Sequence, residues 1–184
     1  MNYIRSGHSM ISYDNYLFAV GGENQSSVER YNISDNIWEK LNPMNYKRMY
    51  PILAIYNGYL YALFGKSNEN EFCNTIERLR LSNNIEKEKW EMVLFNNPQN
   101  IDTRIYGSAV YIINNSIYLF GGKYNEKASN NIIYFVIKDN DLLKEENYLN
   151  INEYFRENKL HKMKNGDLMQ ISDGKYDIFC IHLN

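Results

Sequence analysis

The sequence predicts an all-β fold built from repeats, and three observations support this prediction. An aromatic segment that ends in glycine recurs at Tyr16–Gly22, Tyr59–Gly65 and Ser116–Gly122. Runs of β-branched and aromatic residues flank these segments, and pairs such as Asn-Gly, Asn-Asn and Asp-Gly separate the runs, which is typical of strands and hairpins. No long stretch of the chain has the 3.6-residue apolar period of an amphipathic helix.

Other features recur around these segments in a constant order. An arginine comes first, then the glycine segment, then a Glu-Arg pair, and last a tryptophan. These residues are Arg5, Glu29 and Trp38 in the first unit, Arg48, Glu77 and Trp90 in the second, and Arg104 in the third, which lacks the glutamate. The final glycines are 43 and 57 residues apart and the arginines 43 and 56. This period is typical of propeller blades or helical pairs, and the strand signals favour blades.

The combined pattern resembles the kelch repeat, whose units of about 50 residues form four-stranded blades of β-propellers. The resemblance implies a partial ring of about three and a half blades. The expected boundaries are about 5–44 for blade one, 48–98 for blade two, 104–155 for blade three and 162–184 for a half blade. Closed rings need four to eight blades, and Met1 aligns with Met44 inside a repeat. We therefore expect the chain to be the C-terminal part of a longer propeller, or to be completed by a further chain.

The strands follow in order from the turns and the repeated residues. Two-residue turns join the first two strands of each blade, the Glu-Arg pair lies in the third strand, and the tryptophan lies in the fourth. The expected strands are 8–13, 16–21, 27–33 and 37–41 in blade one, then 51–56, 59–64, 75–81 and 89–94 in blade two. Blade three is expected to have strands at 107–113, 116–121, 131–137 and 147–151, and the half blade a hairpin of 167–172 and 176–181.

Several repeated residues have structural roles in this interpretation. Glycine at the end of the second strand permits a positive φ or a close backbone approach. These glycines are Gly21, Gly22, Gly65, Gly121 and Gly122. We expect Trp38 and Trp90 to fill the space between neighbouring blades, with about 3–5 kcal/mol lost when either is truncated to alanine. Tyr31, Glu29 and Glu77 complete the structural set.

The candidate binding residues belong to one face of the ring. The resemblance implies that Arg5, Arg48 and Arg104 point to this face, where guanidinium groups suit an acidic peptide. The alternative is that the arginines pair with Glu29 and Glu77 inside the blades, which would leave Arg104 freer to bind. The loops after the glycine strands form the rest of the face, with Asn24, Gln25, Ser67, Asn68, Lys123 and Tyr124.

Composition and motifs argue against several functional classes. The formal net charge of −2 and the pI of about 5.9 disfavour a nucleic-acid surface. No apolar run is long enough to span a membrane, and two cysteines cannot build a disulfide scaffold. The three histidines lack metal-ligand spacing, and no phosphate loop or nucleophile elbow is present. The sequence therefore predicts no catalytic residues, metal or cofactor.

The function predicted on these grounds is a non-enzymatic protein-interaction module, a cytoplasmic scaffold or adaptor with possible cytoskeletal association. Alternatives within this interpretation are a substrate receptor of a ubiquitin ligase and a permanent structural subunit of a large complex. A propeller oxidase is a distant alternative, because the histidine pair that copper would need is missing. The expected partners are proteins, bound through an acidic peptide or through exposed blade edges.

Overall fold

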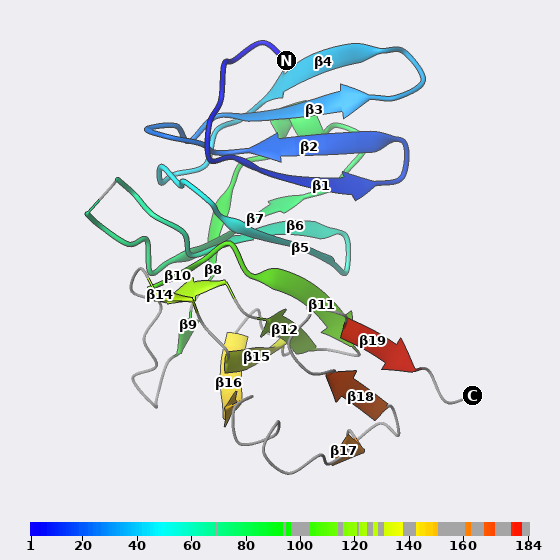
Figure 1. The fold of residues 1–184 in the computed structure, drawn as a ribbon. Coiled ribbons are helices and arrows are strands. Elements are labelled where there is room, and N and C mark those ends of the chain that lie inside the picture. The colour runs from blue at the N-terminus through cyan, green and yellow to red at the C-terminus, as the bar shows by residue number, and fades with distance from the viewer. Residues whose placement is uncertain are drawn as a thin grey trace. The chain divides into compact units, whose positions relative to one another are not determined.

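The computed structural model of the chain describes residues 1–68, 70–93, 95–96, 104–113, 116–120, 122–124, 127–128, 131–137, 143–150, 161–162, 168–171 and 178–181 (Figure 1). The chain forms two compact units, Met1–Tyr148 and Leu149–Asn184. The described residues are all-β apart from one short 3₁₀ turn, in agreement with the predicted fold class.

The first sheet is antiparallel with the strand order β1-β2-β3-β4. Its strands are β1 (Ser9–Tyr13), β2 (Tyr16–Val20), β3 (Val28–Asn32) and β4 (Ile37–Leu41). Each strand lies within one residue of its predicted bounds. Asp14 has a φ of 49°, which the two-residue turn between β1 and β2 requires.

The second sheet repeats this topology in the order β5-β6-β7-β8. Its strands are β5 (Ile52–Tyr56), β6 (Tyr59–Leu63), β7 (Ile76–Arg80) and β8 (Glu91–Val93). The sequence did not predict the 3₁₀ turn η1 (Ile85–Lys87), which lies between β7 and β8. Trp90 therefore precedes the outer strand here, whereas Trp38 lies within β4.

A third sheet has the order β11-β12-β15-β16-β9. Its strands are β9 (Phe95–Asn96), β11 (Ala109–Ile113), β12 (Ser116–Phe120), β15 (Asn131–Ile137) and β16 (Leu143–Asn150). Strand β16 begins four residues before the predicted 147–151, and it pairs in parallel with β9, which the sequence did not predict. A small separate sheet has the order β10-β13-β14 and contains β10 (Ile105–Tyr106), β13 (Lys123–Tyr124) and β14 (Lys127–Ala128).

The predicted C-terminal hairpin is present as β18 (Leu168–Ile171) paired with β19 (Ile178–Ile181). A further short strand, β17 (His161–Lys162), pairs with β18 on its other side. The turn 172–177 lies outside the described residues.

Two apolar clusters hold the first unit together. One joins the first and second sheets and contains Phe18, Val28, Leu60, Leu79 and Trp90 among its buried residues. The other joins the second and third sheets and contains Ile52, Leu63, Ile76, Ile117 and Leu119 among its buried residues. Neither sheet face could be buried by one repeat alone, so stacking of successive sheets supplies the core. In Figure 1 the blue first sheet lies beside the cyan second sheet.

The outward face of the first sheet differs from its counterpart in the second sheet. Trp90 is 5% exposed beneath the first sheet, whereas Trp38 at the corresponding position is only half-buried and packs against the Tyr31 ring. Met10 is 47% exposed where its counterpart Leu53 is 7% exposed. Trp90 therefore fills the space between the first and second sheets, whereas Trp38 lies on the outward face of the first sheet. No other described sheet packs on its face of the first sheet.

Candidate functional site

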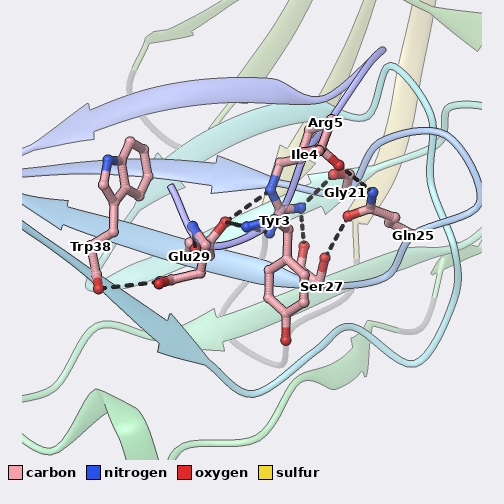
Figure 2. A network of polar contacts seen from close by, with 9 residues as sticks. Tyr3, Ile4, Arg5, Gly21, Gln25, Ser27, Glu29 and Trp38 are labelled. Carbon is pink, nitrogen blue, oxygen red and sulfur yellow. Dashed lines mark hydrogen bonds and ion pairs between the residues drawn. The ribbon is translucent and has the colours of Figure 1, made fainter.

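A buried ion pair anchors the segment that enters the first sheet (Figure 2). The side chains of Arg5 and Glu29 are both 0% exposed, and Nη2 of the arginine lies 3.1 Å from the carboxylate. Nε also donates to this carboxylate, at 3.2 Å. Nη1 donates to the carbonyl oxygens of Gly21 at 2.6 Å and Ser27 at 2.8 Å. The arginine therefore joins the third strand to the end of the second.

Further donors complete the surroundings of Glu29. The backbone N–H groups of Asn2 and Tyr3 donate to its two carboxylate oxygens, and the amide of Asn2 also donates to the carbonyl oxygen of Trp38 at 3.3 Å. Burial by itself would raise the pKa of Glu29, but the hydrogen bonds from Asn2, Tyr3 and Arg5 together outweigh it and lower that pKa below its ordinary 4.5.

The second sheet repeats this network. Arg48 and Glu77 are both fully buried and lie 3.0 Å apart. Nη1 of Arg48 donates to the carbonyl oxygens of Phe64 and Thr75 at 2.9 and 2.8 Å. Asn45 donates to Glu77 and, at 3.1 Å, to the carbonyl oxygen of Trp90. The networks differ at Nε of Arg48, which is buried without a hydrogen-bond partner, and at its Nη2, which also donates to the hydroxyl of Thr75 at 2.8 Å.

The two networks correct the prediction for Arg5 and Arg48. Their guanidinium groups are buried within the chain and bound to Glu29 and Glu77, which is the alternative that the sequence left open. A buried guanidinium that already holds a carboxylate has no accessible surface for an acidic peptide.

Arg104 does not occupy the third equivalent position. The N–H of Gly22 donates to the carbonyl oxygen of Arg48, and the N–H of Gly65 donates to that of Ile105 in the same way. Ile105, which is 2% exposed, therefore takes the place of the buried arginine. Arg104 is exposed, but it also has a partner within the chain, which corrects the expectation that it is freer to bind.

In the third repeat, the position of the buried glutamate changes together with that of the buried arginine. Strand register pairs Ala19 with Glu29 and Ala62 with Glu77, and the same register in the third sheet pairs Leu119 with Ile133. The third repeat thus has isoleucine at both positions where the first two repeats have a buried ion pair. The sequence held a signal of this change, since the last two glycines are 57 residues apart but the last two arginines only 56.

A pH experiment tests the role assigned to Glu29. Because folding lowers its pKa, Glu29 contributes stability above pH 4.5, and this contribution is lost as the pH falls through the folded-state pKa. We expect Glu29→Gln to lower the unfolding free energy at pH 7, and the difference from the unmodified chain to narrow below pH 4.5. Urea unfolding at several pH values measures this difference in unfolding free energy, and Glu86→Gln, at an exposed position, is the control. A difference that stays constant down to pH 3 would contradict the assignment.

A polar pocket of about 380 Å³ lies on the loop face, which we define as residues 21–27, 64–68 and 70–75 with the adjoining Met49. The described residues that line it are Glu23, Asn24, Met49, Ser67, Asn68 and Asn70. Three of the predicted binding residues, Asn24, Ser67 and Asn68, are therefore brought together from two successive repeats. Sequence reasoning missed the other three, because repeat position does not reveal which side chains of an irregular loop face a common space.

Glycine conformation positions the loops of this face. Gly21 has a φ of 68°, and a Cβ there would overlap the carbonyl oxygen of Arg48. Gly65 has a φ of 96°, and its Cβ would lie 2.7 Å from the carbonyl oxygen of Met49. Only glycine permits both the positive φ and the close approach between repeats. Gly22 and Gly122 also have positive φ values, and Gly121 lies outside the described residues.

Comparison with known proteins agrees with this geometry. The family model described as Kelch motif matches residues 4–45, which span the first sheet and its entering segment. Residues 4–45 thus match a kelch motif. The chain is 27% identical over 131 residues to Kelch-like protein 15 of Gallus gallus, covering 66% of this chain and 25% of that protein. Kelch-like protein 15 of Danio rerio is also 27% identical over 131 residues, with 20% of its length covered. The chain thus spans about a quarter or less of the length of these relatives.

The remaining predicted binding residues have varied surroundings. Gln25 donates from its amide to the carbonyl oxygen of Ile4 and accepts from Ser27, so it organises its own loop. Lys123 is exposed in β13, with Nζ 5.9 Å from the centre of the Tyr106 ring. Tyr124 also lies in β13, and its side chain is outside the described part.

Histidine, cysteine and acidic side chains in the described part of the chain are the other candidates for a chemical site. No group of three or more His, Cys, Asp or Glu side chains there could hold a metal ion. The buried thiol of Cys73 lies 3.2 Å from the hydroxyl of Thr75. Burial and then the charge of Arg5 lower the pKa of His8. Among the described residues, no helix has the length and hydropathy that crossing a membrane requires.

Proposed function

We propose that the chain is a non-enzymatic protein-interaction module that acts as a scaffold or adaptor and binds its partner at the loop face. The observation that supports this function is the polar pocket formed by two successive kelch repeats. Amide, hydroxyl and carboxylate groups around a concave surface suit recognition of a polypeptide. A role as the substrate receptor of a ubiquitin ligase is a narrower version of this proposal, based on similarity to Kelch-like protein 15. A place in the cytoplasm stays a prediction from the sequence.

Filling the pocket tests the proposal. In Asn70→Trp the indole would occupy the pocket, while the backbone N–H at position 70 keeps its hydrogen bond to Asn68. The matched control is Asn83→Trp, on an exposed loop at the opposite end of the strands. We expect affinity capture from a lysate of the source organism to retain the same proteins on the unmodified and Asn83→Trp chains, and to lose them on Asn70→Trp. Equal capture by all three chains would contradict binding at the loop face.

We also propose that a further kelch blade covers the open face of the first sheet. The half-buried Trp38 and the exposed Met10 support this second proposal, because their counterparts Trp90 and Leu53 are buried by a neighbouring sheet. A bare sheet face of this kind favours association with another sheet. The stability cost of removing Trp38, relative to that of removing Trp90, tests it.

A further inference from the structure

We propose that the pocket on the loop face accepts a basic side chain, a lysine or an arginine, from the partner protein. The inference rests on the proposed function and reverses the charge of the partner expected from the sequence. Among the described residues that line the pocket there is one carboxylate, that of Glu23, and no cation.

Of the cations next to the pocket lining in sequence, Lys47 is exposed, whereas Arg48 and Lys66 are engaged elsewhere. Arg5 and Arg48 are buried in their ion pairs with glutamate. Lys66 is 7% exposed, and its Nζ lies over two aromatic rings, 5.7 Å from the centre of Phe72 and 5.5 Å from that of Tyr106. The three engaged cations do not supply a positive charge to a ligand in the pocket.

Hydrogen-bond acceptors are available to an incoming cation. Oε2 of Glu23 accepts from the hydroxyl of Ser6 at 2.8 Å, and its Oε1 accepts no hydrogen bond from any described residue. A second carboxylate, that of Glu71, accepts from Ser67 and Asn68 of the pocket lining at 3.3 and 2.7 Å. Two carboxylates in and beside one pocket favour a bound cation.

The rest of the lining suits the remainder of a basic residue. Met49 is half-buried and presents an apolar surface, against which the methylene stem of a lysine or arginine can pack. The side-chain amides of Asn24 and Asn70 make no hydrogen bond with the described residues. They can therefore bond to peptide groups on either side of the inserted side chain.

Local hydrogen bonds hold the pocket in shape before any partner arrives. Glu23 donates its N–H to the carbonyl oxygen of Ser6, and Met49 exchanges two backbone hydrogen bonds with Lys66 at 2.7 and 2.8 Å. In the other loop, the N–H of Ser67 donates to the carbonyl oxygen of Glu71. A fixed pocket loses little conformational entropy on binding, which favours recognition of a single side chain.

An NMR titration tests the inference with three pentapeptide probes. They are acetyl-Gly-Ser-X-Ser-Gly-amide with lysine, norleucine or glutamate at X, added to the full ¹⁵N-labelled chain. We expect the lysine peptide alone to cause saturable shifts of the amide signals of residues 22–25 and 66–71. In Glu23→Gln the apparent affinity should fall at least roughly threefold, because the ion pair is lost. The exposed Glu86→Gln is the control and should bind like the unmodified chain.

Every other result overturns the inference. Equal shifts with norleucine would show that charge is not read, and an unchanged affinity of Glu23→Gln would show that this carboxylate is not the acceptor. Stronger shifts with the glutamate peptide, or no shifts with any probe, would likewise contradict a basic ligand. In those cases, proteins that bind the unmodified chain and not Asn70→Trp would still support the proposed function. Failure of the inference can therefore be distinguished from failure of the proposed function.

Discussion

Arg48→Ile alone is expected to lower the unfolding free energy of the chain by about 3–5 kcal/mol, since it leaves Glu77 buried without its counter-charge. Glu77→Ile alone should be similarly costly, because it leaves a buried guanidinium. The double substitution should cost about 2 kcal/mol less than the sum of the two single ones. The double variant is thus expected to be more stable than two independent substitutions would leave it, because the second substitution removes the charge that the first leaves unpaired.

The third repeat provides the physical reason for this expectation. Ile105 and Ile133 hold the positions that correspond to Arg48 and Glu77, and Ile105 is buried. Apolar residues at these two positions avoid the cost of removing two charges from water. The double variant does not recover fully, because the carbonyl oxygens of Phe64 and Thr75 lose the donor that Arg48 supplies.

Urea unfolding at pH 7, followed by the fluorescence of the two tryptophans, measures all three variants. The surface pair Arg78–Glu91 is the control, because its glutamate is 60% exposed. Glu91→Gln should cost less than about 1 kcal/mol. Strictly additive costs for Arg48→Ile and Glu77→Ile would show that the two side chains do not act as a pair.

Trp90→Ala is expected to cost about 3–5 kcal/mol, and Trp38→Ala only about 1–2 kcal/mol. Trp90 is buried between two sheets, and its indole N–H donates to the carbonyl oxygen of Asn42 at 3.0 Å. Trp38 is half-buried and has the Tyr31 ring as its aromatic partner, 5.2 Å away between centres.

Urea unfolding followed by circular dichroism compares the two tryptophan variants without depending on their fluorescence. The smaller cost for Trp38 applies to a chain whose first sheet has an open face. If a further blade covers that face, Trp38→Ala becomes as costly as Trp90→Ala and also weakens binding of that blade. Light scattering establishes whether the chain is monomeric. If a monomeric chain loses the same unfolding free energy in Trp38→Ala as in Trp90→Ala, the difference in burial between the two tryptophans is contradicted.

Much of the fold could be predicted because turn residues and strand patterns are local. The turns Asp14-Asn15 and Asn57-Gly58 set the first two hairpins, and the strands on both sides lie within about one residue of their predicted bounds. Prediction was less accurate at β8 and β16, where no short turn fixes the start of the strand. The 3₁₀ turn η1 is explained by packing, because it buries Ile85 in the core beside Trp90.

The candidate site was less predictable than the fold. The loops that hold Asn24, Ser67 and Asn68 could be named from repeat position, and the pocket does contain these residues. Glu23 and Met49 were missed, since their place in the lining depends on how loops of two repeats approach each other. The expected charge of the ligand changed from negative to positive for a related reason, because the arginines that were expected to face a partner are buried.

The sequence by itself determined that the chain is all-β, that it is built from repeats that resemble the kelch motif, and where most strands begin and end. These properties depend on side-chain alternation and turn residues that act over a few positions. Only the tertiary structure decided which arginines pair with glutamates, that Ile105 replaces the third arginine, and which tryptophan is buried. Those outcomes depend on contacts between residues that lie 24 to 48 positions apart in the chain, and the burial of these residues sets the cost of each charge and ring.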